Sequence, residues 1–148
     1  MKELTGELMK NRLTIGILIF VAGVICGAIG PTTLLAEGTG LPSTKMVYRG
    51  DLANLPGQEV LIFASDWAPG HQLPLHMHPN GHELVYVVQG EQTFQIEGIG
   101  EKLVKTGEVL HTQPNVPHFG RNATNGLSKT VVIRIKDKDQ PITIGVKK

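Results

Sequence analysis

Cysteine is nearly absent from this sequence, which contains Cys26 and no other. Cys26 lies inside a long apolar run, so the rest of the chain can form no disulfide, no thiolate metal site and no catalytic-cysteine centre. Any metal bound there must be held by nitrogen and oxygen donors. Without a disulfide, the stability of that part of the chain must come from its packed core.

An excess of charge of either sign is also absent. Lys and Arg number 14, Asp and Glu number 13, and the formal net charge is +1. The chain has no block of basic residues and no alternation of basic with aromatic residues. These features exclude an electrostatic basis for binding nucleic acid or an anionic membrane surface.

One long stretch lacks charge altogether, from Leu13 to Ala36. As a helix it would be about 36 Å long, enough to cross a hydrocarbon core. Lys10 and Arg12 precede it, which predicts a cytoplasmic N-terminus and an extracytoplasmic, periplasmic or secreted remainder. Residues 1–36 are then either a signal peptide, cleaved near Ala36 or Gly38, or a retained transmembrane anchor that attaches the protein to the membrane. A buried core helix is the third alternative.

After Ala36 the sequence has no long helical periodicity. Residues 37–45 (EGTGLPSTK) read as a linker, and residues 46–148 as one β-domain in which short apolar runs alternate with turns rich in Gly and Pro. This pattern predicts an all-β fold, a jelly-roll barrel, preceded by the N-terminal apolar helix. The predicted strands are Met46–Tyr48, Glu59–Trp67, Leu73–His78, Glu83–Gln89, Thr93–Glu97, Leu103–Val104, Val109–Leu110, His118–Arg121, Thr130–Lys136 and Ile142–Ile144.

The most informative stretch is GHQLPLHMHPNGHELVYVVQG, from Gly70 to Gly90. His76 and His78 are two residues apart, so in a strand both imidazoles project from the same face. A Pro-Asn-Gly turn signal follows, and Glu83 then opens the next apolar run. Imidazoles with a carboxylate suit a divalent Fe, Mn, Ni, Cu or Zn ion, and His118 offers a further ligand downstream.

The spacing of these residues resembles the first conserved motif of the cupin superfamily. That motif runs Gly, five residues, His-x-His, three or four residues, Glu, six residues, Gly. It is matched here by Gly70, His76, His78, Glu83 and Gly90.

The second cupin motif runs Gly, five residues, Pro-x-Gly, two residues, His, three residues, Asn. Gly107, His118 and Asn122 fall in register with it, whereas Gln113 stands where Pro is usual and Asn115 where Gly is usual. Because Asn tolerates a left-handed backbone better than other non-glycine residues, Asn115 is a mild departure.

The resemblance implies a double-stranded β-helix with His76, His78, Glu83 and His118 as ligands of a divalent metal inside the barrel. It also implies a small-molecule ligand or substrate, and a homodimer formed through strands near Met46–Tyr48. Since cupins include dioxygenases and isomerases as well as binding and storage proteins, the reaction rests on analogy. The function predicted first is an exported metal-dependent cupin of oxygenase type. The alternatives are a non-catalytic ligand-binding or sensor module and a structural zinc barrel.

Other residues near the motifs are candidates for the pocket or for supporting the ligands. Strand alternation places Val85 and Val87 on the same face as Glu83 and His82 on the opposite face, and His71 is expected to be exposed. The remaining candidates are His111 and Asn122 as supporting residues, and Tyr86 and Trp67 as pocket, interface or core residues.

Overall fold

The computed structural model describes residues 40–147, which consist of strands joined by turns and loops. The apolar run 13–36, its predicted helix and its cleavage site lie outside the described residues. Among residues 40–147, no helix is long and apolar enough to span a bilayer.

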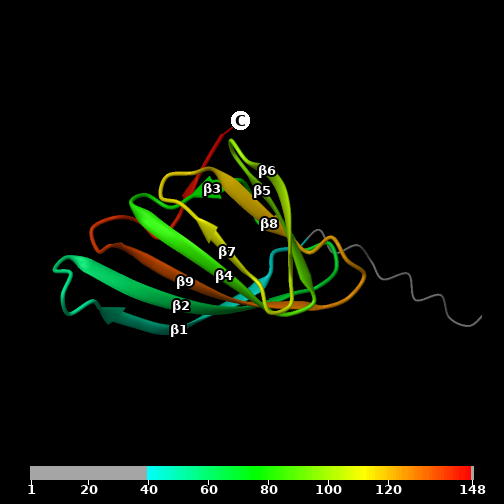
Figure 1. The fold of residues 1–148 in the computed structure, drawn as a ribbon, viewed down its shortest axis with the longest axis horizontal. Helices are drawn as coiled ribbons and strands as arrows, with labels where there is room; N and C mark the ends of the chain where they lie inside the picture. The colour runs from blue at the N-terminus through cyan, green and yellow to red at the C-terminus, as the bar shows by residue number, and fades with distance from the viewer. Residues whose placement is uncertain (1–39, 148) are drawn as a thin grey trace, which may run out of the picture. The chain divides into compact units, whose positions relative to one another are not determined.

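The strands form two antiparallel sheets that face each other, as Figure 1 shows. The first sheet has the order β1-β2-β9-β4-β7 and the second the order β10-β3-β8-β5-β6. The strands are β1 (Ser43–Asp51), β2 (Gln58–Trp67), β3 (His76–Met77), β4 (Gly81–Gln89), β5 (Glu91–Ile96), β6 (Gly100–Lys105), β7 (Val109–Thr112), β8 (His118–Arg121), β9 (Ser128–Asp137) and β10 (Ile144–Gly145). This all-β jelly roll is the fold class that the pattern of short strands predicted.

In strand β4 the order of apolar and polar residues determines which face of the strand is buried. Glu83, Val85 and Val87 are buried, whereas Tyr86 and Val88, each next to a buried residue of the strand, are exposed. This alternation follows from the two-residue period of a strand and fixes which side chains enter the space between the sheets. The core there contains Val85, Val87, Phe94, Ile96, Val104, Leu110 and Val132.

Two strand predictions differ from the structure. Strand β1 begins at Ser43, so the end of the predicted linker belongs to the sheet, and it continues to Asp51, three residues beyond the predicted end at Tyr48. Its pairing with β2 over both segments explains the extension. Strand β3 is only His76–Met77, shorter than predicted, because Pro74 has no N–H to donate to a neighbouring strand.

Two asparagine turns hold the His-x-His segment in place. Asn80 and Asn115 have φ angles of 48° and 62°, and the left-handed backbone expected at Asn115 is therefore confirmed. The N–H of Asn115 donates to the His78 carbonyl at 3.0 Å, and the N–H of Asn80 donates to Asn115 Oδ1 at 3.2 Å. The turn before β4 and the turn before β8 are thereby tied together beside His78.

Candidate metal centre

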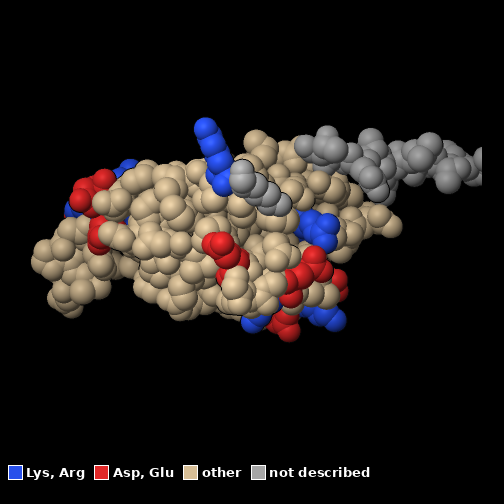
Figure 2. All heavy atoms as spheres, turned by 90° about the horizontal axis from the view of Figure 1, so that it is seen from above, with Lys and Arg blue, Asp and Glu red and all other residues tan. Residues whose placement is uncertain are grey.

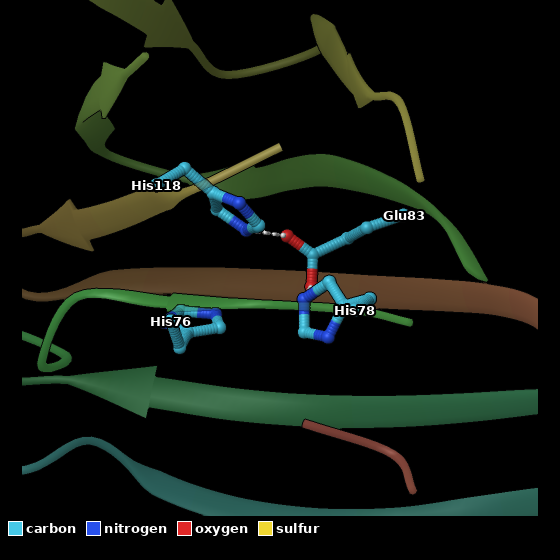
Figure 3. A group of neighbouring side chains, drawn as sticks. All are labelled: His76, His78, Glu83 and His118. Carbon is cyan, nitrogen blue, oxygen red and sulfur yellow. Dashed lines mark hydrogen bonds and ion pairs between the residues drawn. The ribbon is translucent and has the colours of Figure 1, made fainter. Parts of the chain in front are cut away.

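The two sheets bring His76, His78, Glu83 and His118 together between them (Figure 3). His76 lies on β3 and pairs directly with His118 on β8 of the same sheet, while Glu83 comes from β4 of the other sheet. One ligand atom from each residue lies within 4.8 Å of the others, and all four residues are buried.

The orientation of each imidazole is fixed by a backbone carbonyl. Carbonyl oxygens only accept hydrogen bonds, so each Nδ1 must carry the proton and each Nε2 faces the centre. Contacts of this kind orient histidine ligands and fix their tautomer in metal sites. The acceptors are the carbonyls of Pro74, Ile142 and Val116, at 2.7, 2.8 and 2.8 Å from Nδ1 of His76, His78 and His118 respectively.

The inner nitrogens face a carboxylate that cannot donate to them. Nε2 of His78 lies 3.0 Å from Oε2 of Glu83, and Nε2 of His118 lies 3.1 Å from Oε1. The His78 contact is short, but Nε2 has no partner with hydrogen-bond geometry. With Nδ1 already protonated, a neutral imidazole turns a lone pair toward the carboxylate, and only a cation between them relieves the repulsion. A proton or a divalent metal ion satisfies this requirement, so the donor set fits a metal.

Arg134 is the residue at the centre that the sequence analysis missed. Its Nε and Nη2 donate to Oε2 of Glu83 at 3.0 and 2.7 Å, and its Nη1 donates to the Ile142 carbonyl and to Thr143 Oγ1 at 3.2 and 2.8 Å. Glu83 and Arg134 are direct partners across β4 and β9. The sequence contained one indication of this role, since Arg134 is a charged residue within the apolar run TVVIRIK. A charged side chain that faces the interior of a protein needs a partner of opposite charge.

The ionisation of the centre favours metal ligation. Burial is the main reason that the pKa of His76 is lowered to about 4, so this imidazole is neutral at physiological pH. Burial opposes the charged form of Glu83, but the close contacts with His118 and His78 and the charge of Arg134 keep its pKa well below its ordinary value. Both side chains are thus in the protonation state that binds a cation.

A cavity of about 250 Å³ opens beside the centre. Trp67, Val85 and Leu73 contribute to its mostly apolar wall, and Thr44 and Ser65 bring two hydroxyls that are 2.9 Å apart. The full lining is Thr44, Phe63, Ser65, Trp67, Leu73, His76, Glu83, Val85, Phe94, His118, Gly120, Val132, Arg134 and Ile142. Three of the four cluster residues, His76, Glu83 and His118, therefore form part of the wall of this cavity.

Some candidate pocket residues lie elsewhere. Val87 is buried in the core and does not line the cavity. Tyr86 and His111 lie on the outer face of their sheet, because their strand positions alternate with inward-facing ones. There His82 Nδ1 and His111 Nε2 are 3.0 Å apart. His82 thus faces away from Glu83, as its position in the strand predicts.

Asn122 supports a loop and does not line the cavity. Its side chain is fully buried and donates to the carbonyls of Trp67 and Gly126 at 3.0 and 2.7 Å. Its Oδ1 accepts from the N–H of Thr124 at 3.1 Å. The amide therefore closes the loop between β8 and β9.

Comparison with known proteins agrees with this fold. Residues 64–134 match the family described as "Cupin domain". The chain belongs to the cupin superfamily. The cluster that this cupin fold brings together inside the jelly roll could hold a metal ion.

Curated and solved relatives add detail to the cupin assignment. Germin-like protein subfamily 2 member 2 of Arabidopsis thaliana is 30% identical over 134 residues, covering 86% of this chain and 56% of that protein. This chain spans about half the length of the curated relatives it matches.

Two solved structures share the cupin fold at low sequence identity. An uncharacterised protein with a double-stranded β-helix domain from Klebsiella pneumoniae has a TM-score of 0.58 and 18% identity, covering 74% of this chain and 87% of its own. A structure of oxalate oxidase has a TM-score of 0.54 and 22% identity, covering 71% and 55%.

Proposed function

We propose that this cupin domain is a metal-dependent enzyme of the oxidase or oxygenase class that acts on a small organic molecule. The observation that carries the proposal is that three members of the four-residue cluster, His76, Glu83 and His118, line a mostly apolar cavity. A first-row divalent ion held by these residues would supply a Lewis-acidic, redox-capable centre facing that cavity.

The surrounding residues prepare the centre for this role. Carbonyl acceptors hold the three imidazoles with Nε2 inward. Arg134 holds Oε2 of Glu83, which lies 3.0 Å from His78 Nε2, and Oε1 lies 3.1 Å from His118 Nε2. Such preorganisation lowers the cost of assembling the ligands when an ion binds. A substrate in the cavity would contact the apolar walls and the hydroxyls of Thr44 and Ser65.

The size of the cavity limits the substrate. Its volume of about 250 Å³ equals the share of roughly eight water molecules in the liquid. This is slightly below the usual range for ligand pockets, so we infer a compact substrate with an oxygen at one end and an apolar body.

The comparisons support the oxidase class as the first choice. Germin-like proteins are the curated relatives of this chain, and oxalate oxidase is among its structural neighbours. Because the solved structure shares only 22% identity and the chain spans about half of its curated relatives, their substrates are not transferred.

The experiment that tests this function measures dioxygen consumption by the full chain after loading with Fe(II) or Mn(II). Phenols, diketones and small carboxylic acids form the substrate panel. We expect substrate-dependent uptake by the loaded wild type and its loss, together with the bound metal, in His76→Ala and His118→Ala. His71→Ala and His111→Ala serve as controls, since neither side chain belongs to the cluster. Metal-loaded protein that consumes no dioxygen with any compound would contradict the proposal.

A second candidate is a ligand-binding or sensor module without turnover. The observation favouring it concerns the titratable side chains of the cavity wall, which are His76, His118, Glu83 and Arg134. The first three belong to the cluster, and Arg134 is hydrogen-bonded to Glu83. Among residues 40–147, no further acid or base lines the cavity for proton transfer. Thermal stabilisation by a compound that mass spectrometry recovers unchanged would favour this alternative.

We further propose that the cupin domain works outside the cytoplasm. The support is the uncharged run 13–36 with Lys10 and Arg12 before it. Fractionation of cells that express the full chain, with the N-terminus of the product sequenced, tests both location and cleavage. Recovery of uncleaved protein only from the soluble cytoplasmic fraction would contradict the proposal.

A further inference from the structure

Two histidines that take no part in the metal centre meet on the outer face of the first sheet. His82 lies on β4 and His111 on β7, where His111 is the direct partner of Leu84. His82 is therefore a diagonal neighbour of His111 across the two strands, a position from which long side chains reach each other. Nδ1 of His82 lies 3.0 Å from Nε2 of His111. These two residues are called the histidine pair below.

The rings of the histidine pair meet edge to edge. Their centroids are 5.2 Å apart and their planes are inclined by 36°. A hydrogen bond joins the two facing nitrogens, so one of them donates and the other accepts. Because a neutral imidazole can carry its hydrogen on either nitrogen, a change of tautomer leaves both facing nitrogens with a lone pair.

The spacing of the facing nitrogens suits a shared metal ion. Imidazole nitrogens bind Zn(II) at about 2.0–2.1 Å, so two of them lie about 2.9 Å apart when they meet the ion at a right angle and about 3.3 Å apart at a tetrahedral angle. The observed separation of 3.0 Å lies within this range. Rotation about the side-chain bonds is then sufficient to direct both lone pairs at one ion, and β4 and β7 keep their pairing.

The basic side chains of the neighbouring strand point away from the histidine pair. Arg134 and Lys136 lie on β9, which pairs with β4 on the side opposite β7. Both side chains are directed between the sheets, where Arg134 forms an ion pair with Glu83 and Lys136 with Glu59, at 2.7 and 3.0 Å. Their charges are thus neutralised on the other face of the sheet.

A carboxylate lies on the same face as the histidine pair. Ile135 is the direct partner of His82, and Asp137 follows Ile135 by two residues, so Asp137 is a diagonal neighbour of His82 at about 7–8 Å. Its carboxylate accepts hydrogen bonds from the neutral side-chain amides of Gln58 and Asn80, each at 3.3 Å. These contacts hold the negative charge in place without neutralising it, and that charge favours a cation nearby.

The opposite side of the domain has no comparable arrangement. Figure 2 views the domain from the side of the second sheet and shows lysines and arginines next to acidic residues. Arg121 and Glu101 of that sheet form an ion pair at 2.9 Å. The described part of that side therefore has no broad negative patch that would collect cations without specific ligands.

We propose that the histidine pair is a second metal site, on the protein surface, that binds Cu(II), Ni(II) or Zn(II). Imidazole suits these three ions, whereas Mn(II) and Fe(II) bind most weakly in the divalent series. His111 is exposed and His82 half-buried, so water can complete the coordination. The site lies on the opposite face of β4 from Glu83 and is independent of the function proposed for the metal centre. Loading with Fe(II) or Mn(II) leaves the histidine pair free, so His111→Ala remains a control for oxygen uptake.

The first test is the retention of the untagged full chain, in mild detergent, on a resin that carries immobilised Cu(II) or Zn(II). Exposed imidazoles can reach an ion held by a resin, whereas the buried cluster cannot. We expect the wild type to be retained until imidazole is added. His82→Gln and His111→Gln should each lose most of this retention, because one imidazole fills a single coordination position. His71→Gln is the matched control, since the ring of His71 already accepts from the N–H of Ala68, and it should be retained like the wild type.

The second measurement counts the bound ions by titrating the metal-free full chain with Zn(II) against a coloured chelator. We expect two ions for the wild type, and one each for His111→Gln and His76→Ala. The circular dichroism spectrum and an unchanged Mn(II) content show that His111→Gln is folded with its interior cluster intact.

The two sites can fail separately in this titration. A single Zn(II) that is lost in His111→Gln but kept in His76→Ala would support the histidine pair and contradict the metal centre. A single Zn(II) with the opposite behaviour would overturn the surface site. So would a wild type that the resin does not retain, which would leave the histidine pair as a hydrogen bond between strands, or retention that survives both His82→Gln and His111→Gln.

Discussion

Arg134 donates two hydrogen bonds to a single carboxylate oxygen of Glu83, from Nε at 3.0 Å and from Nη2 at 2.7 Å. The same guanidinium reaches the Ile142 carbonyl, which also accepts from His78 Nδ1. One side chain thus connects the acidic ligand, a histidine ligand and the C-terminal segment. The position of the candidate ligands therefore depends on Arg134, which is not itself one of them.

The first prediction concerns this arginine. Arg134→Met should lower the affinity for the bound divalent ion by about 10–100-fold, since losing a group that orients the ligands has this effect in metal sites. Calorimetric titration of the metal-free full chain with Mn(II) or Zn(II) measures the change. Arg121→Met is the control, because Arg121 forms an ion pair with the exposed Glu101, away from the cluster. Equal affinities for Arg134→Met and wild type would show that Glu83 needs no such support.

Metal removal is expected to leave the jelly roll folded. The core of Val85, Val87, Phe94, Ile96, Val104, Leu110 and Val132 packs without the ligands. A chelator should therefore lower the unfolding temperature only by the loss of binding energy and leave the β-sheet circular dichroism signal unchanged. Collapse of that signal on chelation would instead indicate the structural zinc barrel.

A buried charge cluster away from the ligands predicts acid sensitivity. Arg49 donates to Glu59 at 2.7 Å and Lys136 donates to it at 3.0 Å, while Glu59 and Lys136 are almost fully buried. The hydrogen bond from Arg49 is the main reason that the pKa of Glu59 lies below its ordinary value of 4.5. Ionised Glu59 therefore stabilises the fold fully above pH 4.5, and this contribution is lost as the pH falls through the lower pKa of the folded state.

Glu59→Gln should accordingly reduce the free energy of unfolding at neutral pH by about 3–5 kcal/mol, because Lys136 loses its buried counter-ion. The gap between variant and wild type should narrow below pH 4.5. Urea unfolding across this pH range measures both. Glu101→Gln, which breaks an exposed pair, should cost less than about 1 kcal/mol. A gap that is independent of pH would contradict the role assigned to Glu59.

A substitution at Asn122 tests whether this residue affects the stability of the fold, the binding of metal, or both. Asn122→Ala leaves the Trp67 and Gly126 carbonyls without their donor, and the loss should lower the free energy of unfolding by about 1–3 kcal/mol. Bound metal should stay at the wild-type level, because Asn122 is not in the cluster. Asn125→Ala, in the exposed part of the same loop, is the control. Loss of metal from Asn122→Ala would assign this residue to the centre after all.

Strand periodicity explains which neighbours of the ligands could be predicted. Val85 follows Glu83 by two residues and lines the cavity as expected, and His82 faces outward for the same reason. Val87 shares that face and belongs to the core, but it does not line the cavity. The two-residue alternation of a strand predicts which face of the sheet a side chain lies on. It does not predict how far along the barrel a cavity extends.

The types of donor, the His-x-His spacing that points two imidazoles the same way, and the asparagine turn at Asn115 could all be predicted from the amino acids. Each is a local property, set by side-chain chemistry and backbone sterics over a few residues. The contact of Arg134 with Glu83, 51 residues earlier in the chain, and the orientation of His78 by the Ile142 carbonyl became apparent in the folded domain. Those contacts depend on which strands pair and in what register, and that choice is made by packing across the whole domain.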